Sequence, residues 1–81
     1  MTGAPLPHPM PAIRLHALSV REREVLQMAS AGLTNAEIAR RLAVTVHTVK
    51  FHLASIYRKL EVSNRTEAAI AFFRLNSGVS E

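Results

Sequence analysis

Apolar residues recur at steps of three and four positions along most of the chain, which is the spacing of one face of an α-helix. This spacing predicts a first helix from about Val20 to Ala31 and a second from about Asn35 to Leu42. The side chains expected to be buried on these two helices are Val25, Leu26, Met28, Ala29, Ile38, Ala39 and Leu42. Two further helices complete the pattern and no strand is needed, so the sequence predicts an all-α fold.

The third predicted helix has an apolar stripe on one side and a different face on the other. The stripe consists of Val46, Val49, Leu53, Ile56, Tyr57 and Leu60. At about 100° per residue, the opposite face holds His47, Phe51, Ala54, Ser55 and Arg58, with Lys50 on the flank. A helix that packs on a core and turns such a face outward is suited to a groove of a partner.

The fourth predicted helix, from about Arg65 to Leu75, is apolar on more than one face. Its apolar residues are Ala68, Ala69, Ile70, Ala71, Phe72, Phe73 and Leu75. Such a helix must be buried nearly all round, yet a domain this small can cover only one side of it. We interpret Phe72 as core and assign Ala69, Ile70 and Phe73 to a dimer surface, with ordinary core packing as the alternative for these residues.

Each predicted helix begins at a residue that can cap it. In three places a capping residue is followed three positions later by Glu, and such a pair can satisfy two free backbone N–H groups. These pairs are Ser19 with Glu22, Thr34 with Glu37, and Asn64 with Glu67. Thr45 is a fourth N-cap, which can accept from the amide of His47 or Thr48, and Gly32 suits a left-handed residue after the first helix. Only residues 43–45 separate the second helix from the third, which favours a helix-turn-helix connection.

Positive charge is concentrated in one half of the chain. The net charge is +4 and the isoelectric point is near 10.8. Residues 40–74 hold seven Lys or Arg against two Glu, whereas residues 1–39 balance at three against three. A basic half favours a polyanionic partner, because neutralising phosphates releases counterions. A solvated basic surface is the alternative that charge alone leaves open.

The sequence divides into an arm, a domain and a tail. All four prolines lie within residues 1–11, where they oppose regular helix. We therefore expect a disordered arm or linker over residues 1–17, a folded domain over residues 18–76 and a tail over residues 77–81. A minor-groove arm is the alternative for the first segment, but Arg14 is its one basic residue.

No arrangement of side chains suggests catalysis, so we do not expect an enzyme. The chain has no Cys, no Asp and no clustered carboxylates that could serve as nucleophile, acid or base. His47 and His52 are five positions apart rather than the four that would join them on one helix face, so neither a metal nor another cofactor is expected. We expect His47 to reach the partner and His52 to support the helix. No apolar run approaches the roughly 18 residues of a membrane span, and no signal peptide is evident, which together predict a cytoplasmic protein.

Four segments resemble the LuxR-type helix-turn-helix domain. They are LSVREREVL at residues 18–26, GLTNAEIA at residues 32–39, TVKFH at residues 48–52 and IYRKL at residues 56–60. The resemblance covers roughly residues 17–75 in the right order and spacing. It implies a three-helix core plus a C-terminal dimerisation helix, unrelated to the winged-helix fold. It also implies a bacterial transcription regulator that binds double-stranded DNA as a homodimer, with the third helix in the major groove and a location at the nucleoid.

The same resemblance assigns DNA contacts to individual residues. It implies base contacts from Lys50, Phe51 and Ala54, and backbone contacts from Thr45, Thr48, Arg58 and Lys59. Lys50 is expected to hydrogen-bond guanine O6 and N7, whereas Phe51 and Ala54 can only meet a thymine methyl. Some relatives carry a basic or polar residue in place of Ala54. For Lys50, Arg58 and Lys59 a solvated surface position is the alternative, and for Phe51 the alternative is packing on the tail.

The start of the second helix is a further candidate for a phosphate contact. The backbone amides near Thr34 and Asn35 could grip an anion at this helix N-terminus, although simple capping explains both residues as well. Arg40 and Arg41 remain open between phosphate contact and solvent.

Two other functions compete with the regulator. In the first, the chain is an interaction module whose last helix pairs with a full-length LuxR-type relative and blocks its DNA binding. In the second, the motif belongs to the promoter-binding part of a sigma factor, which would copurify with RNA polymerase core. A steep loss of DNA affinity with salt would favour the regulator over the interaction module.

Overall fold

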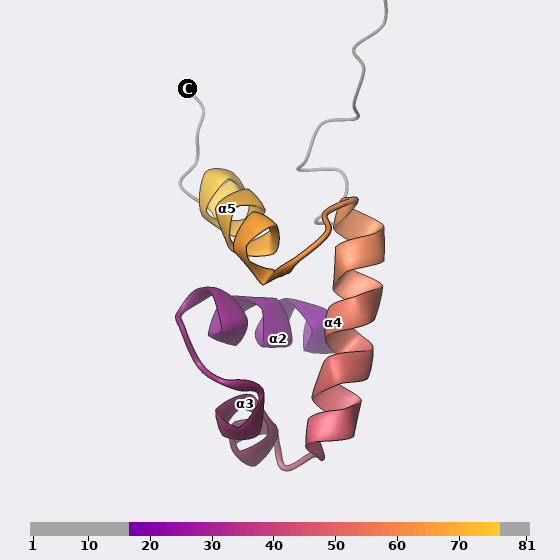
Figure 1. Cartoon of the computed structure of the whole chain (residues 1–81), viewed down its shortest axis with the longest axis vertical. Helices are drawn as coiled ribbons and strands as arrows, with labels where there is room; N and C mark the ends of the chain where they lie inside the picture. Colours follow the sequence, from indigo (N-terminus) through magenta and orange to yellow (C-terminus); the bar gives the residue numbers. More distant parts are fainter. Residues whose placement is uncertain (1–16, 77–81) are drawn as a thin grey trace, which may run out of the picture.

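The computed structural model describes residues 17–76, which fold into four helices and no strand (Figure 1). The helices are α2 (Val20–Ser30), α3 (Asn35–Leu42), α4 (Val46–Leu60) and α5 (Arg65–Asn76). The all-α fold class is confirmed, and the ranges predicted for the first, second and fourth helices agree with α2, α3 and α5 to within one residue. The predictions for residues 1–16 and 77–81, including the role of Arg14, lie outside the described residues. The division of the chain at residues 17 and 76 stays a prediction.

Helices α2, α3 and α4 begin at the caps that the sequence predicts. Ser19 and Thr34 each form a complete capping box. The side-chain oxygen of the cap accepts from the backbone amide three residues on, and the carboxylate of the Glu at that position accepts from the backbone amide of the cap. At Thr45 the hydroxyl accepts from the amide of Thr48 rather than that of His47, at 3.0 Å. Each cap satisfies backbone donors that a helix N-terminus leaves unpaired.

The third predicted capping box forms only in part. Asn64 Oδ1 accepts from the Glu67 amide at 2.9 Å, as expected. The Glu67 carboxylate, however, accepts from the amide of Ser63 at 2.7 Å, one residue before the cap. The first turn of α5 is therefore tied to the loop before it by a slightly longer bridge than the capping-box pattern predicts.

Three helices end in the same manner, with a residue of positive φ just past the last turn. After α2 this residue is Gly32, at φ 98°, as predicted. After α3 it is Ala43 and after α4 it is Glu61, both at φ 58°. In each case the next amide reaches back to a carbonyl of the last turn, as Leu33 does to Met28 at 3.1 Å. This hydrogen bond pattern is the Schellman motif, which reverses the chain within a few residues.

The core forms where α2, α3, α4 and α5 meet. Its buried apolar residues are Leu18, Val25, Leu26, Ala29, Ile38, Ala39, Val49, Leu53, Ile56, Leu60 and Ala68. Met28, Leu42, Tyr57 and Phe72 are half-buried against this cluster. The predicted burial of Val25, Leu26, Ala29, Ile38 and Ala39 is thereby confirmed. Met28 and Leu42, also predicted to be buried, are only half-buried, and Phe72 packs against the core as predicted.

Two residues of α4 lie differently from the prediction. Val46, assigned to the apolar stripe, is 38% exposed because it starts the helix at the edge of the core. Ser55, assigned to the outward face, is buried and donates a hydrogen bond to Glu22 of α2. Because α4 packs against α2, α3 and α5, its buried surface is wider than a single stripe.

Helix α4 runs along one side of the molecule, and the other three helices all lie on one side of α4 (Figure 1). In this view α2 meets the middle of α4, α3 lies near its N-terminal end and α5 near its C-terminal end. One long face of α4 is thereby left without a covering helix.

Candidate nucleic-acid interface

The uncovered face of α4 carries half of the residues predicted to meet DNA. Its exposed side chains are His47, Lys50, Phe51, Ala54 and Arg58. Phe51 is 68% exposed, which is costly for an aromatic side chain unless a partner covers it. The ring of His52, which is half-buried, lies edge-on to that of Phe51 with 6.1 Å between centroids. The face therefore combines cationic, aromatic and small side chains within about three turns of helix.

The first turn of α4 presents two hydroxyl groups. Thr45 is exposed and Thr48 is half-buried, and the Thr45 hydroxyl donates to Thr48 Oγ1 at 3.0 Å. Thr45 Oγ1 also accepts from the Thr48 amide. The cap is thus preformed at the helix end where the dipole favours an anion.

The first turn of α3 is tied to the first residue of α5. Arg65 donates from one guanidinium nitrogen to the carbonyl of Leu33 at 2.8 Å and from the other to Asn35 Oδ1. Thr34 is exposed and caps the helix, while Asn35 is half-buried with its side chain held by Arg65. The two residues predicted to contact phosphate therefore differ. Thr34 is exposed to solvent, whereas the side chain of Asn35 is hydrogen-bonded to Arg65.

Basic residues of α3 lie in its last turn. Arg40 and Arg41 are both exposed. The Thr34 backbone and side chain donate to Glu37 and lower the pKa of its carboxyl, with a smaller contribution from the charges of Arg40 and Arg41. Glu37 thus stays ionised and offsets part of the positive charge on this helix.

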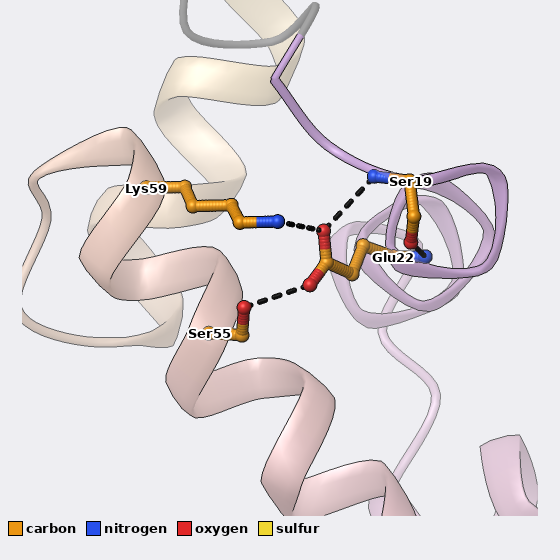
Figure 2. A network of polar contacts seen from close by, with 4 residues as sticks. All are labelled: Ser19, Glu22, Ser55 and Lys59. Atoms are coloured by element: carbon orange, nitrogen blue, oxygen red, sulfur yellow. Dashed lines mark hydrogen bonds and ion pairs between the residues drawn. The ribbon is translucent and has the colours of Figure 1, made fainter.

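Lys59 is held by a buried carboxylate between α2 and α4 (Figure 2). Its Nζ lies 2.9 Å from Glu22 Oε1, and the Glu22 side chain is 8% exposed. The same carboxylate accepts from the Ser55 hydroxyl at 2.7 Å and from the Ser19 amide at 2.9 Å. We call this group of Ser19, Glu22, Ser55 and Lys59 the Glu22 clamp.

The environment of Glu22 keeps its carboxylate ionised. Burial on its own raises the pKa of this group, but donation from the Ser19 backbone, Lys59 and Ser55 outweighs that effect, as does the positive charge of Lys59. The result is a pKa lowered from 4.5 to about 2. The ion pair with Lys59 therefore persists at neutral pH.

Helix α5 leaves apolar side chains uncovered on the side away from the core. Ile70 is 49% and Phe73 is 56% exposed, while Ala69 is half-buried. A shallow hollow beside Ile70 is lined by Val62, Glu67, Ala71 and Arg74. The Phe73 ring packs edge-on against that of Phe72, with centroids 5.9 Å apart. Ile70 and Phe73 thus leave apolar surface on α5 that the monomer does not bury.

The described residues contain no group of three or more His, Cys, Asp or Glu side chains that could hold a metal ion. None of the helices α2 to α5 has both the length and the apolar character needed to cross a membrane.

A family comparison identifies the domain that carries this face. Residues 16–72 match the family described as bacterial regulatory proteins of the luxR family. The chain belongs to the LuxR family. The resemblance inferred from the four sequence segments is therefore confirmed. The match takes in α2, α3 and α4 whole and most of α5.

Individual LuxR-family relatives support the same conclusion. YhjB of Escherichia coli K12, named for an HTH-type transcriptional regulator, is 55% identical over 56 residues, which are 69% of this chain and 28% of YhjB. SgaR of Hyphomicrobium methylovorum, a transcriptional regulatory protein by name, is 44% identical over 62 residues, or 76% of this chain and 29% of SgaR. The transcriptional regulatory protein LiaR of Bacillus subtilis is 44% identical over 59 residues, which are 73% of this chain and 28% of LiaR. The chain thus spans less than a third of each of these relatives, and the family and the relatives together support a DNA-binding transcription regulator.

The LuxR-family fold brings some of the predicted site residues together and separates others. His47, Lys50, Phe51, Ala54 and Arg58 share one exposed face of α4. Thr34 and Asn35 are on α3, and the residues assigned to a dimer surface are all on α5. Lys59 is drawn toward α2.

Two contacts between helices are not predicted by the sequence pattern: that of Glu22 with α4 and that of Arg65 with the start of α3. The spacing predicts Glu22 only as part of a capping box and Arg65 only as the first residue of the fourth helix. The single sequence signal for Glu22 is its position on the inward side of α2, three residues before Val25, where an acidic residue is unexpected unless paired.

Proposed function

We propose that this domain binds double-stranded DNA as a homodimer, with α4 in the major groove. The observation that carries the proposal is the uncovered face of α4, which holds Lys50 and Arg58 among its exposed residues while its other side is buried in the core. A major groove admits one α-helix, and a basic helix surface attracts the phosphates on either side. Membership of the LuxR family supports the same assignment.

Sequence would be read by three side chains at the centre of this face. Lys50 offers an ammonium group that suits guanine O6 and N7. Phe51 and Ala54 offer only apolar surface, which suits a thymine methyl group. Covering Phe51 would also remove the cost of its exposure to water.

Phosphate contacts would flank the base readers. Thr45 and Thr48 lie at the N-terminal end of α4, His47 and Arg58 lie along it, and Thr34 lies at the start of α3. Hydroxyl groups, basic side chains and helix N-termini are the usual donors to phosphate. Asn35 would add a contact although Arg65 already holds its side chain, whereas the ammonium group of Lys59 is already bound to Glu22. These contacts would position the domain without selecting sequence.

The homodimer would form through Ala69, Ile70 and Phe73 of α5. Pairing two copies would cover the apolar surface that the monomer exposes. A two-fold axis there would present two α4 helices to successive turns of DNA, about 34 Å apart, so the operator would be an inverted repeat. Such a regulator would act in the cytoplasm at the nucleoid, where it meets RNA polymerase at promoters.

Selection from random duplexes tests the proposal directly. The purified chain is mixed with random-sequence DNA at moderate salt, the bound pool is sequenced, and the experiment is repeated with Lys50→Ala. We expect an enriched inverted repeat whose affinity falls by about 1–3 kcal/mol in the variant. An unenriched pool, or an affinity that Lys50→Ala leaves unchanged, would overturn the assignment of α4 as the reading helix.

The exposed α5 surface also favours a second candidate, an interaction module that pairs with a full-length LuxR-type relative and keeps it from DNA. Salt dependence separates the two functions. A domain that makes four to six phosphate contacts loses affinity with a log–log slope of about −0.9 per contact. A chain that binds the relative but shows no salt-dependent affinity for DNA would be the interaction module.

A further inference from the structure

Glu22 is the one buried charged side chain in the described part of the chain, and no proposed DNA contact uses it. Buried charges are retained in small domains only where they are paired and hydrogen-bonded. Here the pairing is complete, because both carboxylate oxygens accept hydrogen bonds, from Ser55 at one oxygen and from Lys59 and Ser19 at the other.

The clamp joins the N-terminus of α2 to the C-terminal half of α4. Ser55 and Lys59 are four residues apart, so they lie on the same side of α4, one turn from each other. Figure 2 shows both side chains pointing from α4 toward the carboxylate of Glu22. Two attachments on one side of the helix oppose both its rotation about its axis and its sliding along that axis. Lys50 and Phe51 are exposed on the same helix.

The same geometry binds the ammonium group of Lys59 to Glu22. Its Nζ is 2.9 Å from Glu22 Oε1, and the side chain is only 35% exposed. Turning Lys59 toward a phosphate would leave Glu22 buried with its strongest cationic partner gone, which is costly for an ionised carboxylate. Arg58, the adjacent residue, is exposed, and the side-chain donors to Glu22 are Ser55 and Lys59.

We propose that Lys59 is a positioning residue that acts through Glu22 and makes no phosphate contact. Together with Ser55 it sets the rotation of α4 at which Lys50 meets base edges. The inference rests on the proposed function of α4 as the DNA-reading helix. In this proposal Lys59 affects DNA binding through the orientation of α4 and not through a direct contact with a phosphate.

The salt dependence of binding separates these two roles. The full chain, Lys59→Met and Arg58→Met are titrated with random-sequence duplex between about 50 and 200 mM KCl, at a temperature where circular dichroism shows each variant fully folded. Methionine keeps most of the aliphatic stem in both variants. We expect Arg58→Met to reduce the log–log slope by about 0.9, the loss of one phosphate contact, and Lys59→Met to leave the slope unchanged. A slope reduced by about 0.9 in Lys59→Met would overturn the proposal.

Specificity supplies a readout that lost stability alone would not change. Glu22→Gln and Lys59→Met are compared on a selected site and on random duplex. A misplaced α4 loses base contacts but keeps phosphate contacts, so we expect both variants to reduce the ratio of specific to random affinity. An unchanged ratio in Lys59→Met would overturn the positioning role even if Glu22→Gln does not fold.

A double-mutant cycle tests the clamp without DNA. Urea unfolding is measured for Glu22→Gln, Lys59→Met, the double variant and the parent chain. Lys59→Met should lower the folding constant about tenfold, the loss expected for a hydrogen bond to a charged group, and should lower it much less when Glu22 is already Gln. Additive effects would overturn the clamp. If the parent chain binds no duplex, the proposed function fails, and this cycle still decides whether Lys59 acts on Glu22.

Discussion

Glu22 shows how one buried carboxylate can organise a domain of this size. Three donors from two helices converge on it, and they hold its pKa near 2 against the effect of burial. The exposed pair of Arg21 and Glu24 on the same helix has its nearest atoms 3.7 Å apart and is nearly half exposed at both ends. Exposed pairs of this kind contribute little to stability, so the buried group should dominate the response of the fold to acid.

The stability of the domain should therefore fall in acid because of Glu22. Its pKa in the folded chain, about 2, lies below the ordinary 4.5, so its contribution is fully present above pH 4.5 and is lost as the pH falls toward 2. The size of the shift corresponds to about 3 kcal/mol. Urea unfolding of the parent chain and of Glu22→Gln at a series of pH values measures this contribution.

We expect Glu22→Gln to be destabilised at pH 7 and to lose less stability than the parent chain between pH 4.5 and 2. Glu24→Gln is the matched control, since Glu24 is exposed on the same helix and should leave the acid response close to that of the parent. Parallel pH curves for the parent and Glu22→Gln would contradict the prediction.

At the scale of the elements, the helix ends determine how sharply the chain turns. Two of the three left-handed end positions hold residues other than glycine, Ala43 and Glu61. For a residue with a side chain this conformation costs roughly 1–2 kcal/mol. Ala43 adopts it in the connection between α3 and α4, where the turn sets the angle between the two helices.

Replacing Ala43 with glycine should stabilise the domain. Glycine relieves the strain at φ 58° but adds freedom to the unfolded chain, so the net gain should be about 0.5–1 kcal/mol. Ala54→Gly is the control, because Ala54 is exposed within α4 and should lose about 1 kcal/mol there. Thermal unfolding followed by circular dichroism measures both, and a destabilised Ala43→Gly would contradict the account of the turn.

The elements were largely predictable because their signals are local. Caps such as Thr34 and the left-handed Gly32 lie within a few residues of the groups that they satisfy, so spacing alone revealed them. Ser55 was misassigned because its partner Glu22 is 33 residues away and periodicity does not say which neighbours cover a helix. The ion pair of Lys59 spans 37 residues and was invisible for the same reason. Periodicity therefore predicts which residues share the exposed face of α4, whereas the Glu22 clamp depends on contacts between residues far apart in the sequence.

At the scale of the whole molecule, a small core is paired with an exposed apolar helix face. The fourth helix contributes Ala68 to the buried core and packs Phe72 against it, while Ile70 and Phe73 stay in solvent. A domain of this size buries a modest fraction of its surface. Burying the α5 face in a partner would therefore add substantially to its stability.

Dimerisation should be abolished by a charge at the centre of that face. We expect Ile70→Glu to sediment as a monomer in analytical ultracentrifugation, since two like charges would meet across a two-fold axis in an apolar contact. Thr66→Glu is the control, because Thr66 is exposed on the same helix and lies outside the residues assigned to the dimer. A dimer that persists in Ile70→Glu would exclude this surface as the interface.

The uncovered Ile70 and Phe73 also bear on how much of the protein a cell must make. In the proposed dimer, folding and pairing are linked by mass action, so the melting temperature should rise with protein concentration. Below the dimer dissociation constant, occupancy of an inverted repeat would increase with the square of the monomer concentration. A twofold change in expression would then change promoter occupancy about fourfold, and the apolar face of one helix would set the threshold at which the gene responds.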